Sequence, residues 1–178
     1  MTTRRQAFLL LALCALLYLP GRAAIQLYTR GEAREALAVR EVVDTGRWLV
    51  PMRPDGKLTR KPPLFYWSGM LGWQLVPSSP ELAVRLPSVV AGAVGVVAVA
   101  CLGPAAVGAP AASAALILAT SFEWMRAATS ARVDMLLSAA MTLVLLGWIA
   151  QLAGRTARWT HVLVALGAAL AVLAKGPI

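Results

Sequence analysis

Leu58-Thr59-Arg60-Lys61-Pro62-Pro63-Leu64-Phe65-Tyr66-Trp67 is the stretch that decides how the rest of this chain is interpreted. Two cations stand directly before two prolines, and a run of aromatic and aliphatic residues follows. Proline is tolerated in the first turn of a helix, because the N–H that it lacks would have no intrahelical partner there. The stretch therefore predicts a helix that begins near Pro62 or Pro63 and ends near Val76, just before Pro77.

The start of this predicted helix favours an anion. Its free N–H groups and positive dipole end lie beside Arg60 and Lys61, and phosphate suits this arrangement best. The helix is apolar on nearly every side and rich in Trp and Tyr, as segments at a membrane interface are. We expect the stretch to bind the head of a phospholipid-like substrate, with Tyr66 and Trp67 at the lipid interface. Ordinary anchoring to the membrane surface is the alternative.

The composition indicates a polytopic membrane protein. The chain has 178 residues, of which 59% are hydrophobic and 14% charged, and its mean hydropathy is +0.70. The apolar residues come in long blocks, as transmembrane helices require. The formal charge of +9 does not indicate a nucleic-acid partner, because most cations flank apolar spans instead of forming a basic stripe. Cys14 and Cys101 lie inside such spans and imply no disulfide framework.

We predict an all-α fold with about five transmembrane helices. The first apolar span follows a basic head, as in a signal peptide, but Pro20–Ala24 is an unconvincing cleavage site. We therefore expect a retained span, with a signal-anchor as the alternative. A long outer loop over 28–85 should carry amphipathic helices beside the membrane. The expected spans are 7–27, 86–102, 109–124, 135–152 and 162–173.

The outer loop shows the pattern of an amphipathic helix over residues 30–45. Thr29-x-x-Glu32 matches a capping box, small apolar residues then recur with helical spacing, and Thr45-Gly46 supplies a stop. Such a helix would lie on the membrane surface. Glu32 falls on its apolar stripe and should point toward whatever that stripe covers.

The distribution of cations predicts a cytoplasmic N-terminus. Arg4 and Arg5 precede the first span, and Arg155 and Arg158 separate the last two spans. The positive-inside rule places both pairs in the cytoplasm. The basic loop over 28–85 would then face outward, which a loop approaching 60 residues tolerates.

Charged side chains at membrane depth are costly and suggest function. Two carboxylates are candidates on the outward side, Glu32 in the loop and Asp134 at the start of a span. The purely structural alternatives are a capping role for Glu32 and pairing with Arg132 for Asp134.

Several ordered motifs resemble a known family. They are Glu32–Ala36, Gly46–Pro51, Lys61–Trp67, Ala83–Ser88, Arg126 with Arg132–Asp134, and Leu173–Pro177. They look like bacterial membrane glycosyltransferases of GT-C architecture, related to the aminoarabinose transferase that acts on lipid A and to protein O-mannosyltransferases. Two positions depart from that family. Gly31 stands where it usually has Asp, and Arg60 where it has an acidic residue.

The resemblance implies a sugar donor linked through phosphate to a polyprenyl lipid, and a lipid, protein or glycan acceptor. Glu32 or Asp134 would be the general base of an inverting displacement. Lys61, helped by Arg60, Arg85 or Lys175, would stabilise the departing phosphate. The resemblance leaves open whether a divalent cation is required. The sequence itself shows no cluster of metal ligands.

The resemblance also implies a location in the bacterial inner membrane and a longer protein. We expect this chain to be an N-terminal fragment that is inactive alone. Two other classes compete with the transferase. A transporter or lipid flippase would carry ionisable groups near the midplane, whereas the charges here gather at one interface. A non-catalytic membrane scaffold would use the long loop only as a docking surface.

Overall fold

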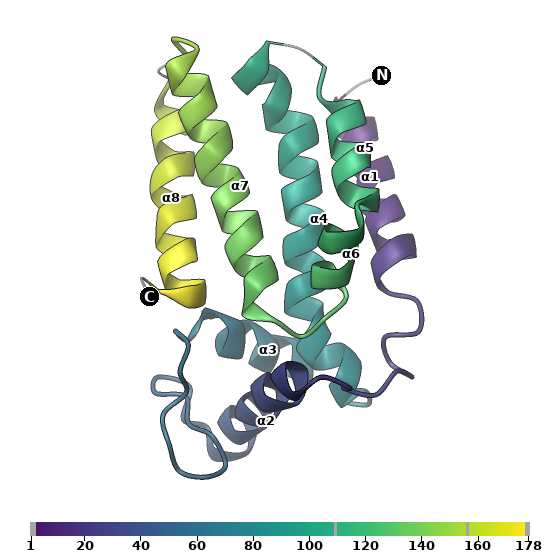
Figure 1. Ribbon diagram of the computed structural model, residues 1–178, viewed down its shortest axis with the longest axis vertical. Helices are drawn as coiled ribbons and strands as arrows, with labels where there is room; N and C mark the ends of the chain where they lie inside the picture. The colour runs from purple at the N-terminus through teal and green to yellow at the C-terminus, as the bar shows by residue number, and fades with distance from the viewer. Residues whose placement is uncertain (1–2, 109, 156, 177–178) are drawn as a thin grey trace.

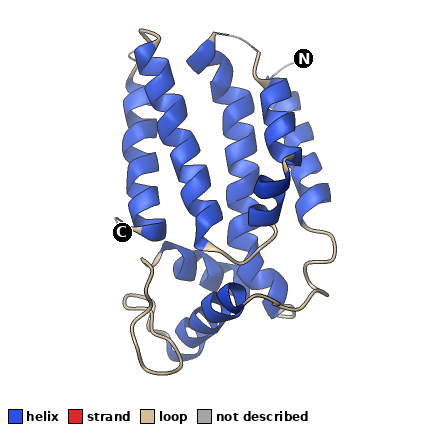
Figure 2. Cartoon of the chain, in the orientation of Figure 1, coloured by secondary structure: helices blue, strands red, loops and turns tan. Residues whose placement is uncertain are grey.

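The computed structural model describes residues 3–108, 110–155 and 157–176, and this part of the chain is mainly helical (Figure 2). The helices are α1 (Thr3–Tyr18), α2 (Arg30–Thr45), α3 (Leu64–Leu75), α4 (Pro80–Val107), α5 (Ala112–Thr120), α6 (Phe122–Ala128), α7 (Val133–Leu152) and α8 (Arg158–Lys175).

The helices form an elongated bundle with a cap at one end (Figure 1). Helices α1, α4, α5, α7 and α8 run along the long axis, and α7 packs against both α4 and α8. Helices α2 and α3 lie across one end of the bundle. The start of α1 and the turn between α7 and α8 lie at the opposite end, so the two predicted cytoplasmic groups of cations share one side. The prediction of an all-α polytopic membrane fold is confirmed.

Among the described residues, three helices are long and apolar enough to cross a membrane: α4, α7 and α8. Two expected spans differ in shape from the prediction. Helix α1 ends at Tyr18 and not near residue 27, because Pro20 follows at once and Gly21 adopts a φ of 73°. The expected span 109–124 is divided into α5 and α6, since the backbone at Ser121 is extended (φ −66°, ψ 137°).

Both helices that were predicted within the loop 28–85 are present. Helix α2 has the predicted bounds: its cap residue Thr29 accepts a hydrogen bond from the Glu32 backbone N–H at 3.1 Å, and Gly46 ends it with a left-handed φ of 68°. Helix α3 begins at Leu64, directly after Pro63. The two helices pack closely, because a Cβ on Gly69 would lie 2.6 Å from a methyl group of Val39.

Glycines also let the loop helices and the bundle approach each other. A Cβ on Gly72 of α3 would lie 2.3 Å from the backbone oxygen of Ala83 in α4. A Cβ on Gly92 of α4 would lie 2.7 Å from the Cβ of Ala128. The first contact holds the cap against the bundle, and the second lies within the bundle, between α4 and α6.

Candidate functional site: a cationic cleft at the capped end

A polar cleft of about 290 Å³ lies where the loop helices meet the bundle. Four segments that are distant in the sequence form it: the first two turns of α2, the residue Lys61 ahead of α3, the start of α7 and the end of α8. Its lining residues are Gly31, Arg34, Glu35, Lys61, Arg132, Val133, Asp134 and Lys175.

Cations outnumber carboxylates in the cleft, with four of the former and two of the latter. Asp134 accepts a hydrogen bond from Lys175 Nζ at 2.8 Å. Its carboxylate is 47% exposed, so it is open to the cleft. Within the described residues, neither Lys61 nor Arg132 forms a side-chain ion pair. The surplus positive charge therefore lies on Lys61 and Arg132, where a phosphate would find charged donors.

The second carboxylate of the cleft is held by the protein itself. Glu35 Oε1 accepts hydrogen bonds from Arg34 Nε at 3.1 Å and Nη2 at 2.9 Å. Its Oε2 accepts a hydrogen bond from the Tyr66 hydroxyl at 2.7 Å. Burial, followed by this hydrogen bond to Glu35, raises the pKa of Tyr66 above that of an ordinary phenol. Glu35 thus joins α2 to α3 and is fully occupied by these contacts.

The helix N-terminus that opens on the cleft belongs to α7. Val133 and Asp134, in the first turn of this 20-residue helix, line the cavity. A helix start carries free N–H groups and positive partial charge, which add to the attraction for an anion. The sequence pointed to the start of α3 instead. There, Pro62 lies against the end of α8, since a Cβ on Gly176 would be 3.3 Å from its ring. Of the predicted stretch, only Lys61 reaches the cleft.

Three of the predicted site residues meet in the cleft: Lys61, Asp134 and Lys175. The other predicted site residues lie outside it. Glu32 and Arg85 are buried beside it and pair with each other at 3.3 Å. Arg60 is exposed and does not line the cleft.

The predicted interface residues Tyr66 and Trp67 differ from each other in their surroundings. The side chain of Tyr66 lies in the protein core, whereas Trp67 is partly exposed and donates to the backbone oxygen of Trp48 at 2.6 Å.

The sequence did not predict that Arg34 and Glu35 line the cleft. It also did not predict that Arg132 belongs to the site. Arg132 was considered only as a partner of Asp134, but the partner of Asp134 is Lys175. A cation directly before a span that opens with Asp was the available signal for Arg132. For Glu35 the signal was its place near the apolar stripe of α2, where a buried acid needs a donor.

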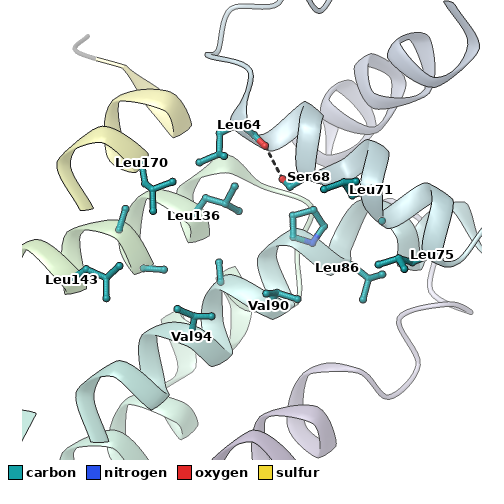
Figure 3. Close-up of a pocket in the computed structure, with 15 residues that line it drawn as sticks. Leu64, Ser68, Leu71, Leu75, Leu86, Val90, Val94, Leu136, Leu143 and Leu170 are labelled. Carbon is teal, nitrogen blue, oxygen red and sulfur yellow. Dashed lines mark hydrogen bonds between the residues drawn. The ribbon is translucent and has the colours of Figure 1, made fainter. Parts of the chain in front are cut away.

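An apolar groove of about 380 Å³ lies between α3 and the helices of the bundle (Figure 3). Side chains of α3, α4, α7 and α8 line it, and Ser68 turns its hydroxyl to the Leu64 backbone oxygen at 2.8 Å. Leu64 follows the Lys61-Pro62-Pro63 stretch, and Leu136 follows Asp134 in α7. The groove therefore begins on the same elements that carry the charges of the cleft.

Among the described residues, no group of three or more His, Cys, Asp or Glu lies together in a way that could hold a metal ion.

Fold and cleft together define a multi-pass, all-α membrane protein with a cationic cleft at one end of its bundle. The family model described as dolichyl-phosphate-mannose-protein mannosyltransferase matches residues 60–178. The chain belongs to this family, and the resemblance to GT-C membrane glycosyltransferases is confirmed.

Solved structures agree with this assignment. The chain is similar to ArnT from Cupriavidus metallidurans in the apo state, with 26% identity and a TM-score of 0.81 over 95% of this chain and 32% of that chain. The fold also matches ArnT from Cupriavidus metallidurans bound to undecaprenyl phosphate, with 23% identity, a TM-score of 0.70 and the same coverage of 95% and 32%. The chain thus spans about a third of the ArnT chain. No curated protein matches the sequence.

Proposed function

We propose that this chain forms the donor-phosphate site of a glycosyltransferase that uses a polyprenyl-phosphate-linked sugar. The observation that carries the proposal is the cleft, in which Lys61 and Arg132 present charges that no described carboxylate neutralises. ArnT, a structural relative, has been captured with undecaprenyl phosphate, which supports a lipid phosphate as the ligand. The acceptor is a lipid, a protein or a glycan.

The lipid of the donor would use both cavities. With the phosphate in the cleft, the polyprenyl chain would have an apolar surface nearby, because α7 and α8 contribute to both the cleft and the groove. The cavity volume of about 380 Å³ lies in the range of small-molecule sites. The cationic cleft and the apolar groove would together select an amphiphile with an anionic head group.

In the proposed reaction, Asp134 is the general base, because it is the half-exposed carboxylate of the cleft. It takes the proton from the acceptor hydroxyl, and that oxygen attacks the anomeric carbon with inversion. The bond between this carbon and the phosphate oxygen breaks, and the lipid phosphate leaves. Lys61 and Arg132 stabilise the charge that grows on the phosphate, while Lys175 holds Asp134 in place.

The proposed location is the outer face of the bacterial inner membrane, with the N-terminus in the cytoplasm. The capped end would then face outward and the turn between α7 and α8 inward. Arg155 of that turn donates to the Pro104 backbone oxygen at 3.0 Å and so binds the end of α4 on the proposed inner side.

Binding of undecaprenyl phosphate to the chain in detergent micelles tests the proposal. Lys61→Ala removes a charged donor, which is worth about 1.5–3 kcal/mol, so the affinity should fall roughly 10- to 100-fold. Lys61→Arg should restore only part of it, because a planar fork replaces a point charge. Lys57→Ala is the matched control, since Lys57 is exposed in the same loop and does not line the cleft. Equal affinities for Lys61→Ala and Lys57→Ala would refute the phosphate site.

A further inference from the structure

Arg85 of α4 is a buried cation that binds three backbone carbonyls. Its Nη1 donates to the oxygens of Arg22 at 2.8 Å and Ile25 at 2.6 Å, and its Nη2 donates to that of Gln26 at 3.0 Å. Its Nε donates to Glu32 Oε1 at 3.3 Å. Arg85 thereby fixes the non-helical segment between α1 and α2, and it uses every nitrogen of its guanidinium group to do so.

Glu32 continues this network to the rim of the cleft. The same Oε1 atom accepts a hydrogen bond from the Ala131 backbone N–H at 3.0 Å. On α4, one turn after Arg85, the Ser88 hydroxyl donates to the Arg132 backbone oxygen at 3.2 Å and lies 3.4 Å from the Arg132 backbone nitrogen. The backbone of Ala131 and Arg132 is therefore held by a side chain of α2 and by one of α4.

The backbone that these contacts hold carries two residues of the cleft. Arg132 is the cap residue of α7 and Asp134 lies in its first turn. A movement of the 131–132 backbone would displace the Arg132 guanidinium group and the Asp134 carboxylate together. Glu32 and Ser88 do not line the cleft. Through this turn they can influence a ligand that they do not touch.

We propose that Glu32, Arg85 and Ser88 are positioning residues, which hold Arg132 and Asp134 in the orientation that binds the donor phosphate. The inference rests on the proposed function for its ligand. It assigns Glu32 a role other than that of general base. A base must reach the proton that it removes, whereas the Glu32 carboxylate is 7% exposed and occupied by Arg85 and Ala131.

The charges of the network dictate which variants are useful. Removing one partner of a buried ion pair leaves the other without compensation and destabilises the fold strongly. Arg85 substitutions are therefore poor probes. Ser88→Ala removes a neutral hydroxyl and leaves the ion pair in place. Glu32 substitutions are poor probes for the same reason as Arg85 substitutions, because they leave the buried Arg85 charge without its partner.

The experiment measures two quantities on the chain in detergent micelles: hydrogen exchange of a peptide that spans residues 129–134, and affinity for undecaprenyl phosphate. Ser88→Ala should accelerate exchange at the 131–132 amides and weaken binding about 5- to 10-fold, as loss of one hydrogen bond in the turn would. Ser121→Ala is the matched control, because its partly buried hydroxyl donates to the Leu118 backbone oxygen at 3.0 Å and lies outside the 129–134 segment. It should leave both nearly unchanged.

Unchanged exchange in Ser88→Ala would overturn the inference, and so would faster exchange with unaltered affinity. If the unsubstituted chain itself fails to bind undecaprenyl phosphate, the proposed function falls. The exchange data and the modification rate of Arg132 by phenylglyoxal then decide the positioning role. Equal modification rates in the unsubstituted chain and in Ser88→Ala would refute that role.

Discussion

Lys175, at the end of α8, donates a 2.8 Å hydrogen bond to Asp134, at the start of α7. Each side chain lies at the helix end whose dipole it complements, with an anion at an N-terminus and a cation at a C-terminus. The contact joins the two helices at the side of the bundle that carries the cleft. Asp134 is 47% and Lys175 29% exposed, so solvent screens the pair and its contribution to stability is at most about 1 kcal/mol.

The first prediction separates the chemical role of Asp134 from its structural one. Asp134→Asn should lower sugar transfer by roughly 10²- to 10⁴-fold, as loss of a general base does, while the free energy of unfolding changes by about 1 kcal/mol or less. Transfer is measured in proteoliposomes with the full-length gene product and a polyprenyl-phosphate sugar donor.

Asp44→Asn is the control for this prediction, because Asp44 pairs with Arg40 on the exposed face of α2 at 3.4 Å. It should retain normal transfer. Near-normal turnover in Asp134→Asn would exclude Asp134 as the base and leave it a helix-end partner of Lys175.

The second prediction concerns the approach of α3 to α4. Gly72→Ala would place a methyl group 2.3 Å from the Ala83 backbone oxygen, so the two helices must separate. Such overpacking typically costs about 1–3 kcal/mol. The measurement is thermal unfolding of the chain in detergent, followed by circular dichroism.

Gly31→Ala is the matched substitution. A Cβ there has only ordinary contacts, the nearest being Arg132 Nη2 at 3.8 Å, and alanine is the better helix former. Its stability should be equal to that of the unsubstituted chain or slightly higher. Equal loss of stability in the two variants would contradict the close contact between Gly72 and Ala83.

The sequence predicted the elements that local rules determine. The bounds of α2 follow from its cap Thr29 and its stop Gly46, and the start of α3 follows from its two prolines. The site was predicted less well from the sequence than the helices were, because its residues meet only through tertiary packing. Asp134 and Lys175 are distant in sequence, and neither carries a local signal of the other. Glu32 was predicted to face the covered side of α2, but only the fold shows that Arg85 and Ala131 are what it meets.

The third prediction concerns topology. Asp55 lies at an exposed turn of the 28–85 loop. In a background without Cys14 and Cys101, Asp55→Cys should react with a membrane-impermeant thiol reagent added to intact spheroplasts. Arg155→Cys, in the turn between α7 and α8, is the control and should react only after the membrane is opened. The reverse pattern would invert the orientation and place the cleft in the cytoplasm.

The fourth prediction uses the buried hydrogen bond between Tyr66 and Glu35. Tyr66→Phe removes a 2.7 Å donor from a buried carboxylate, so it should destabilise the chain by about 1–3 kcal/mol near pH 8. Tyr28→Phe should have little effect, because Tyr28 is 78% exposed. Thermal unfolding in detergent measures both differences.

The same pair predicts a pH dependence at alkaline pH. Burial and Glu35 raise the pKa of Tyr66 in the folded chain, while the unfolded chain releases this proton near the ordinary value of about 10. The folded state therefore binds more protons than the unfolded state above that pH, and its stability falls as the pH rises. The contribution is fully present below about pH 9 and declines from about pH 10 upward, toward the raised pKa of Tyr66 in the folded chain. Tyr66→Phe lacks this contribution, so the stability difference between the two chains should shrink above about pH 10.

Other titrating groups are common to both chains and cancel in the difference. A difference that stays constant from pH 8 to 11 would show that Tyr66 ionises as an ordinary exposed phenol does, and the buried link between α2 and α3 would have to be abandoned.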